Sequence, residues 1–210
     1  MSYTEQDAAI DEMYARISEE LYPEHKEQAV SEFTADRLRS YYLANPMVMR
    51  PAVEALQEVK RLQANGHSSA VVVFCATAIE LFLKATVLQP IVHGLVHSPG
   101  LADVIVKYAV GQTGFDRYRD LLSRLFQELA ELDITKVARD GSKSALMDES
   151  RKVQELRNDI IHKGLFCDHV AAEHAINVAV AVYERIVGPM LGALGLTVVS
   201  KGRIELTISR

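Results

Sequence analysis

The segment SSAVVVFCATAIELFLKATVLQ, residues 68–89, is apolar on almost every side of the helix that its length predicts. Its three consecutive valines also suit a buried strand, but buried strands are usually only about four to eight residues long. A helix without a polar face is typical of the central helix of a bundle. Glu80 and Lys84 lie within the segment, which favours the core helix of a soluble protein over a membrane span.

Further helices are predicted on both sides of this central one. Apolar residues recur at helical spacing over residues 51–64, 99–110, 115–132, 144–163 and 169–187. Pro90 and Gly188-Pro189 are expected to stop two of these helices, because proline lacks the N–H that a helix interior needs. His67-Ser68-Ser69 and Asp168 can cap helix starts, and Gly164 can end a helix.

The last residues, 196–208, alternate between apolar and polar side chains around Lys201-Gly202, which predicts a short β-hairpin. The fold class predicted from these patterns is all-α, a helical bundle with a small β-hairpin at its C-terminal end.

The first 45 residues differ from the rest in charge. They carry ten Asp or Glu and four Lys or Arg, a net charge of −6, whereas residues 46–210 have a net charge of +1. Apolar residues at helical spacing on both sides of Pro23 predict two amphipathic helices there. We therefore expect an acidic N-terminal helical extension (1–45), a helical bundle (46–195) and a C-terminal hairpin (196–210).

Composition narrows the class of protein. The chain has 210 residues, of which 49% are hydrophobic and 24% charged, so it can bury a sizeable core. A formal net charge of −5 and a pI of about 5.8 disfavour a protein that coats nucleic acid along its whole surface, but leave room for a local basic site. Two cysteines and no visible signal peptide predict a cytoplasmic protein with reduced thiols and no membrane partner.

The segment Arg157-Asn158-Asp159-Ile160-Ile161-His162 combines residue types that suit chemistry on a phosphodiester. At 100° per residue, Asn158 and His162 lie one turn apart on the side opposite the apolar residues, and Arg157 lies at the shoulder. Four residues within about 80° mark the predicted core side: Leu146, Val153, Leu156 and Ile160. His162 is therefore expected to face solvent, a groove or a second subunit.

An imidazole can take the proton of a ribose 2′-OH near neutral pH. A guanidinium can hold the phosphate through two hydrogen bonds and stabilise the negative charge that develops there. Asn158 can orient either the phosphate or His162, and the reaction needs no metal ion or other cofactor. The same residues also fit the solvated end of an ordinary helix.

This pattern resembles the signature of the HEPN superfamily, small all-α bundles in which a histidine follows an arginine after four to six residues. The residue after that arginine is typically polar, as Asn158 is here. The segment Ala78-Ile79-Glu80-Leu81-Phe82-Leu83-Lys84 is similar to the Glu- and Lys-bearing helix of many HEPN domains. The resemblance covers roughly residues 50–190. The acidic N-terminal segment and the C-terminal hairpin depart from the family pattern.

The resemblance implies a metal-independent endoribonuclease that cuts single-stranded RNA at a site shared by two subunits of a homodimer. It implies that Arg157 and His162 are catalytic, that Asn158 supports them, and that the products end in 2′,3′-cyclic phosphate and 5′-OH. HEPN proteins also occur as toxins paired with antitoxins and as effectors of anti-phage defence. The alternatives are a module of the same fold that binds a nucleotide or RNA without cutting it, and one that serves only dimerisation or docks a protein partner.

Several charged residues near the motif have two interpretations. Glu80 and Lys84 can pair with each other, or Glu80 can bind Arg157 and leave Lys84 near the phosphate. A positive rim for RNA, or a solvated helix face, is formed by three residues: Arg151, Lys152 and Lys163. The acidic extension can pack as ordinary helices, or it can cover the cleft as a phosphate mimic.

No metal site is predicted from the sequence. His93 and His97 have the spacing of two ligands on a helix but lack an obvious third. Cys167, His169 and His174 offer three donors at irregular spacing, one fewer than a structural zinc site needs.

Overall fold

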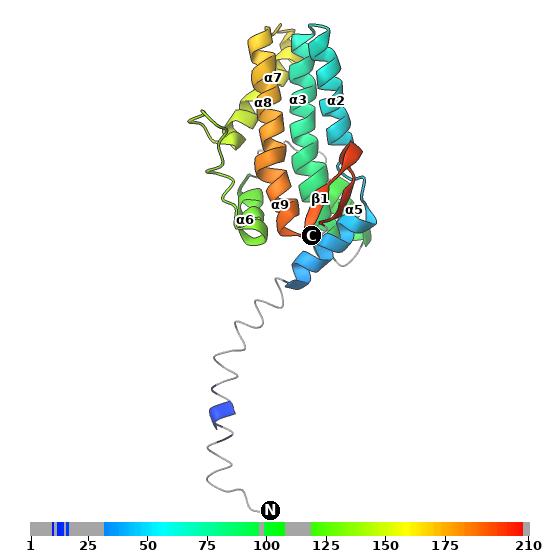
Figure 1. Ribbon diagram of the computed structural model, residues 1–210, viewed down its shortest axis with the longest axis vertical. Helices are drawn as coiled ribbons and strands as arrows, with labels where there is room; N and C mark the ends of the chain where they lie inside the picture. The colour runs from blue at the N-terminus through cyan, green and yellow to red at the C-terminus, as the bar shows by residue number, and fades with distance from the viewer. Residues whose placement is uncertain are drawn as a thin grey trace, which may run out of the picture.

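The apolar segment forms the centre of a helical bundle, so the predicted all-α fold is confirmed (Figure 1). The structure is a computed structural model that describes residues 10, 12–14, 16, 32–96, 99–107 and 119–207. The central helix, α3 (Ser68–Leu83), packs against three long neighbours: α2 (Arg50–Ala64), α7 (Leu146–Lys163) and α8 (His169–Val182).

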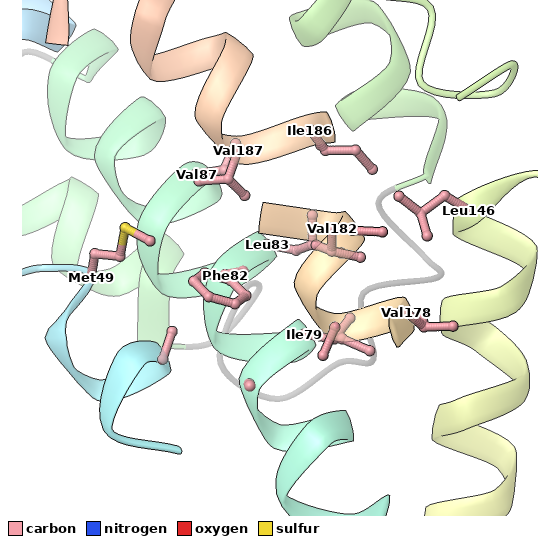
Figure 2. Packing of buried hydrophobic residues seen from close by; sticks show 14 of the residues in the cluster. Met49, Ile79, Phe82, Leu83, Val87, Leu146, Val178, Val182, Ile186 and Val187 are labelled. Atoms are coloured by element: carbon pink, nitrogen blue, oxygen red, sulfur yellow. The ribbon is translucent and has the colours of Figure 1, made fainter. Parts of the chain in front are cut away.

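A large part of the core lies between α3 and α8 (Figure 2). Ile79, Phe82 and Leu83 of α3 lie beside Val178 and Val182 of α8, and none of these side chains is more than 1% exposed. Burying an aliphatic or aromatic side chain of this size contributes about 1.5–3 kcal/mol. This burial accounts for the absence of a polar face on α3.

The prediction that Pro90 stops the central helix is wrong. The helix passes through a π-helical turn, η1 (Lys84–Leu88), and continues as α4 (Gln89–Leu95). Pro90 is then in the first turn of α4, where a backbone N–H needs no helical partner. In a regular α-helix, the carbonyl of Thr86 would accept the backbone N–H of residue 90, which proline lacks. This carbonyl accepts a 2.5 Å hydrogen bond from the Tyr42 hydroxyl.

The same correction applies to Gly188-Pro189. α8 continues through a second π-helical turn, η4 (Tyr183–Val187), into α9 (Gly188–Ala193). The N–H of Gly188 bonds the carbonyl of Tyr183, five residues back, which sets the proline in the first turn of the new helix.

Part of the acidic segment shares the bundle's core. Residues 32–44 are helical, and Leu38 is 1% exposed within the main hydrophobic cluster. Arg39 Nε donates a 2.8 Å hydrogen bond to the carbonyl of Leu194 at the end of α9. Residues 32–44 of the predicted extension therefore pack into the core of the predicted bundle. Of the two helices predicted on either side of Pro23, the second is confirmed over residues 32–44, and the first lies almost wholly outside the described residues.

The remaining elements close the lower end of the bundle in Figure 1. They are α5 (Pro99–Ile105), α6 (Arg119–Ala130), β1 (Leu196–Val198), the 3-10 turn η5 (Ser200–Gly202) and β2 (Ile204–Leu206). β1 and β2 form the predicted antiparallel hairpin. The N–H of Ile204 bonds the carbonyl of Pro46 at 2.8 Å, which ties the hairpin to the bundle.

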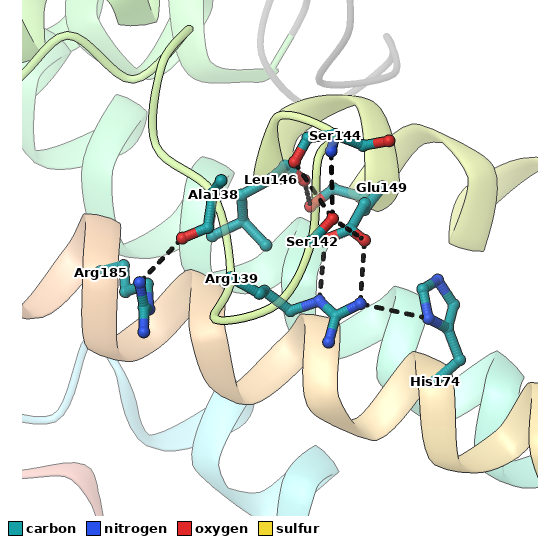
Figure 3. A network of polar contacts seen from close by, with 9 residues as sticks. Ala138, Arg139, Ser142, Ser144, Leu146, Glu149, His174 and Arg185 are labelled. Carbon is teal, nitrogen blue, oxygen red and sulfur yellow. Dashed lines mark hydrogen bonds and ion pairs between the residues drawn. The ribbon is translucent and has the colours of Figure 1, made fainter.

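A polar network fixes the start of α7 (Figure 3). Arg139 donates through Nε (2.8 Å) and Nη2 (2.9 Å) to the two carboxylate oxygens of Glu149, and Ser142 Oγ donates to one of them at 3.0 Å. The Nη2 of Arg139 also lies 3.4 Å from Nδ1 of His174 on α8. Arg185 of η4 holds the same loop by a 2.8 Å bond to a backbone carbonyl. The network joins the helix that carries the motif to α8.

Two helical stretches, Ser68–Gly94 and His169–Ala193, are long and apolar enough to cross a membrane by length and composition. Both contain central helices of the bundle, with 67% and 50% of their most apolar windows buried inside the protein. A buried core helix satisfies the same criteria, so this property does not distinguish a membrane protein from one with a large core.

Candidate functional site

The predicted motif lies in the last two turns of α7. The helix ends at Gly164, whose φ of 69° is the left-handed conformation that glycine adopts most easily. The N–H groups of Gly164 and Leu165 bond the carbonyls of Ile160 and Asp159 at 3.2 and 3.3 Å. These bonds satisfy the end of the helix and fix the position of the turn that holds His162.

The predicted orientation of α7 is confirmed. Leu146 and Val153 are buried, and Ile160 packs against the core, whereas Asn158 and His162 are exposed. The buried side is wider near the helix start than predicted and includes three more residues: Met147, Glu149 and Ser150.

Arg157 is turned toward the side of α7 that bears His162. Its Nη1 donates a 2.9 Å hydrogen bond to Oδ1 of Asn158. This is the one hydrogen bond that the Arg157 side chain makes within the described residues, so most of its five N–H donors are free for an anion. His162 makes no hydrogen bond in the same part of the chain. A guanidinium and an imidazole with free capacity therefore lie on one exposed face.

Glu80 and Lys84 pair with each other, as the first of the two interpretations predicts. Lys84 Nζ lies 2.7 Å from Glu80 Oε1, with the two side chains 12% and 29% exposed. The alternative, a hydrogen bond from Arg157 to Glu80, is not formed. The end of the motif helix meets the start of α3, where the N–H of Cys167 bonds Ser69 Oγ at 2.9 Å. Glu80 lies eleven residues farther along α3, about 16 Å at 1.5 Å per residue.

The predicted positive rim is largely neutralised on its own helix. Arg151 pairs with Glu155 at 2.9 Å, and Lys163 pairs with Asp159 at 2.7 Å. Lys152 is exposed and makes no ion pair within the described residues. The outer face of α7 therefore alternates in charge, unlike the uniformly basic surface of a protein that tracks a nucleic-acid backbone.

An exposed apolar patch, not predicted from the sequence, borders the motif. It consists of four side chains from the end of α7 to the start of α8: Ile161 (50% exposed), Leu165 (44%), Phe166 (92%) and Val170 (74%). The signal available in the sequence is Leu165-Phe166 directly after the helix-ending Gly164. Two large apolar residues in a connecting loop indicate either local packing or an intermolecular contact.

The start of α3 lies beside this patch. A surface cavity of about 370 Å³ is lined by residues 66–70 together with Phe166 and Cys167. The expectation that His67-Ser68-Ser69 caps α3 is not met, because no side chain there bonds the helix start. Ser69 Oγ instead accepts the N–H of Cys167 and holds the loop against α3. By contrast, Asp168 caps α8 as predicted, accepting the N–H of Ala171 at 2.9 Å.

One buried polar atom near the motif lacks a partner. The side-chain Oε1 of Gln154 on α7 is inaccessible to solvent and makes no hydrogen bond. It is the one such side-chain atom in the part of the chain that the structure describes. More than nine in ten buried polar groups in proteins are paired, which makes this oxygen unusual.

The residues weighed as metal ligands are not gathered by the fold. No group of three His, Cys, Asp or Glu among the described residues lies close enough to hold a metal ion. His93 stacks on Tyr41 with ring centroids 5.5 Å apart, and His97 lies outside the described residues. Burial raises the pKa of the Cys75 thiol to about 12, and burial followed by the charge of Asp168 raises the pKa of Cys167. Neither thiol is therefore activated as a nucleophile.

Comparison with known proteins yields no relative. No protein-family model, no curated protein and no solved structure matches the chain.

Proposed function

We propose that this chain is a metal-independent endoribonuclease of the HEPN type, with a site formed between two copies. The observation that carries the proposal is the exposed face at the end of α7, where Arg157, held by Asn158, and His162 have free hydrogen-bonding capacity. A toxin or anti-phage role, with an antitoxin as partner, remains a prediction from the family resemblance alone.

The proposed reaction cleaves the bond between phosphorus and the 5′-oxygen of the next nucleotide. His162 takes the proton of the ribose 2′-OH, and the 2′-oxygen then forms a bond to phosphorus. Arg157 stabilises the negative charge that develops on the phosphate oxygens. The 5′-oxygen leaves with a proton from the protonated histidine of the second copy. The products carry 2′,3′-cyclic phosphate and 5′-OH ends.

The apolar patch supports a dimer through this face. Phe166 is almost wholly exposed, and Ile161 lies on α7 between Asn158 and His162 in the sequence. Large exposed apolar side chains that adjoin a polar site are typical of protein contacts. The alternating charges on the outer face of α7 leave it close to neutral, so a second copy that meets it by two-fold symmetry is not repelled.

The decisive experiment is end-group analysis of mixed RNA incubated with purified protein in EDTA. We expect cyclic-phosphate ends from the unmutated protein and at least a hundredfold fewer from His162→Ala, because removing a general base costs about 10²–10⁴-fold in rate. His169→Ala is the matched control, since His169 is also exposed at this end of the bundle but lies outside the motif. Equal cutting by all three proteins contradicts the assignment of His162. RNA binding without any cutting supports the non-catalytic alternative.

A second experiment tests the dimer. Light scattering after gel filtration should give twice the chain mass for the unmutated protein and for Leu101→Ser, an exposed leucine on α5 (53%). Phe166→Ser should give a monomer that folds normally and cuts RNA slowly. A dimer that persists in Phe166→Ser contradicts the proposed interface.

A further inference from the structure

The unpaired oxygen of Gln154 lies next to the motif on the same helix. Gln154 precedes Arg157 by three residues and Asn158 by four, so it is one helical turn away from both. At 100° per residue it lies about 60° from Arg157 and about 40° from Asn158 around the helix axis. Side chains at these spacings are neighbours, with Cβ atoms about 5–6 Å apart.

The position of this oxygen limits which groups can pair with it. It is covered by protein, so an RNA group arriving from solvent does not reach it. It also lies about 140° around α7 from Glu149, which places it away from the Arg139 network. Side chains of α7 that carry donors within one turn of Gln154 include Arg151, Arg157 and Asn158. Arg151 is paired with Glu155. Arg157, by contrast, is the cation of the motif and uses only Nη1, in its bond to Asn158.

We propose that Gln154 is a positioning residue for Arg157, an inference that rests on the proposed ribonuclease function. When the guanidinium binds the phosphate, its Nε–H donates to Gln154 Oε1 while Nη1 keeps its bond to Asn158. The remaining Nη1 and Nη2 hydrogens then face the phosphate as a two-pronged donor. Gln154 and Asn158 together hold the guanidinium plane, and the motif becomes Gln154-x-x-Arg157-Asn158-x-x-x-His162.

The first test compares Gln154→Met, which keeps the length of the side chain but has no acceptor, with Gln154→Glu, which keeps an acceptor oxygen. We expect Gln154→Met to lower kcat at least tenfold with KM within twofold, and Gln154→Glu to keep kcat within threefold of the unmutated protein. Gln127→Met, at an exposed glutamine of α6, is the matched control. Thermal unfolding of each variant checks that it is folded. A folded Gln154→Met with unchanged kcat overturns the proposal.

The second test does not depend on cleavage. Nitrogen-15 NMR follows the Arg157 Nε–H as the protein is saturated with a 2′-O-methyl oligonucleotide, which lacks the attacking hydroxyl. We expect hydrogen exchange of this group to slow at least tenfold in the unmutated protein and to stay fast in Gln154→Met. Equal exchange in both proteins, or no slowing in either, overturns the role of Gln154. Failure of the unmutated protein to cut RNA overturns the ribonuclease proposal alone.

Discussion

Replacing Arg139 by alanine tests whether the network at the start of α7 holds the motif helix in place. The Glu149 side chain is 6% exposed and receives both prongs of the Arg139 guanidinium, at 2.8 and 2.9 Å. Without Arg139, the carboxylate keeps only the 3.0 Å bond from Ser142. Removing one partner of a buried ion pair costs about 3–5 kcal/mol. Since Ser142 remains, we expect about 3 kcal/mol, the lower end of that range.

Urea and thermal unfolding measure this cost. A loss of about 3 kcal/mol lowers Tm by roughly 6–12 °C in a domain of this size. Arg151→Ala is the matched control, because its pair with Glu155 has side chains 48% and 59% exposed. Such a surface pair contributes about 0.5 kcal/mol. The reasoning is refuted when Arg139→Ala and Arg151→Ala lower the free energy of unfolding equally.

Three further predictions concern single contacts. The bond from Arg139 lowers the pKa of Glu149 below its usual 4.5, so this carboxylate stabilises the fold above pH 4.5, and the contribution is lost as the pH falls. In Glu149→Gln, the free energy of unfolding should therefore fall less steeply below pH 4.5 than in the unmutated protein. Tyr42→Phe should cost about 1–3 kcal/mol in urea unfolding, because it leaves the buried Thr86 carbonyl without its donor. Gly164→Ala should destabilise the fold by about 1–2 kcal/mol, because alanine is strained at a φ of 69°. Gly192→Ala in α9 should stabilise the fold slightly, because nothing lies within 4 Å of the added methyl and alanine favours a helix. A change of the unfolding free energy in the same direction for both variants would contradict this.

The bundle could be predicted because its main signals are local. The apolar run of α3 exceeds the length of a buried strand and lacks a polar face, and the helix period alone places it at the centre. The orientation of α7 follows from the same period, which is why the exposure of Asn158 and His162 matches the prediction. The cap at Asp168 and the stop at Gly164 are likewise set by residues within one turn of each helix end.

The π-helical turns could not be predicted, because their cause is not local. A proline within an apolar run normally ends a helix. Here the helix continues past Pro90, and the carbonyl that the proline leaves free is taken by Tyr42, which is 44 positions from Thr86 in the sequence. The pairing of Arg139 with Glu149 has the same character, since a loop folds back to bring the two together. Contacts of this kind exist only once the fold has formed.

The motif and the side of α7 on which it lies could be predicted from the sequence, but the surroundings of the motif could not. The pattern from Arg157 to His162 can be recognised in one dimension, whereas the apolar patch around Phe166 depends on which face of the loop the bundle leaves uncovered. The unpaired oxygen of Gln154 is also invisible in the sequence, because glutamine is an ordinary residue of an exposed helix face. It becomes informative only when the structure shows that it is buried.

Charge links the proposed dimer to the proposed chemistry. On one copy, Glu155 and Asp159 offset Arg151 and Lys163, so the outer face of α7 attracts a polyanion only weakly. In the proposed dimer, two copies meeting through the apolar patch would bring two Arg157 side chains into one cleft, while the paired charges around them would stay neutral. The positive potential is then confined to the place where the phosphate is to be held. A protein with a pI of about 5.8 can in this way bind RNA at one point without a basic surface.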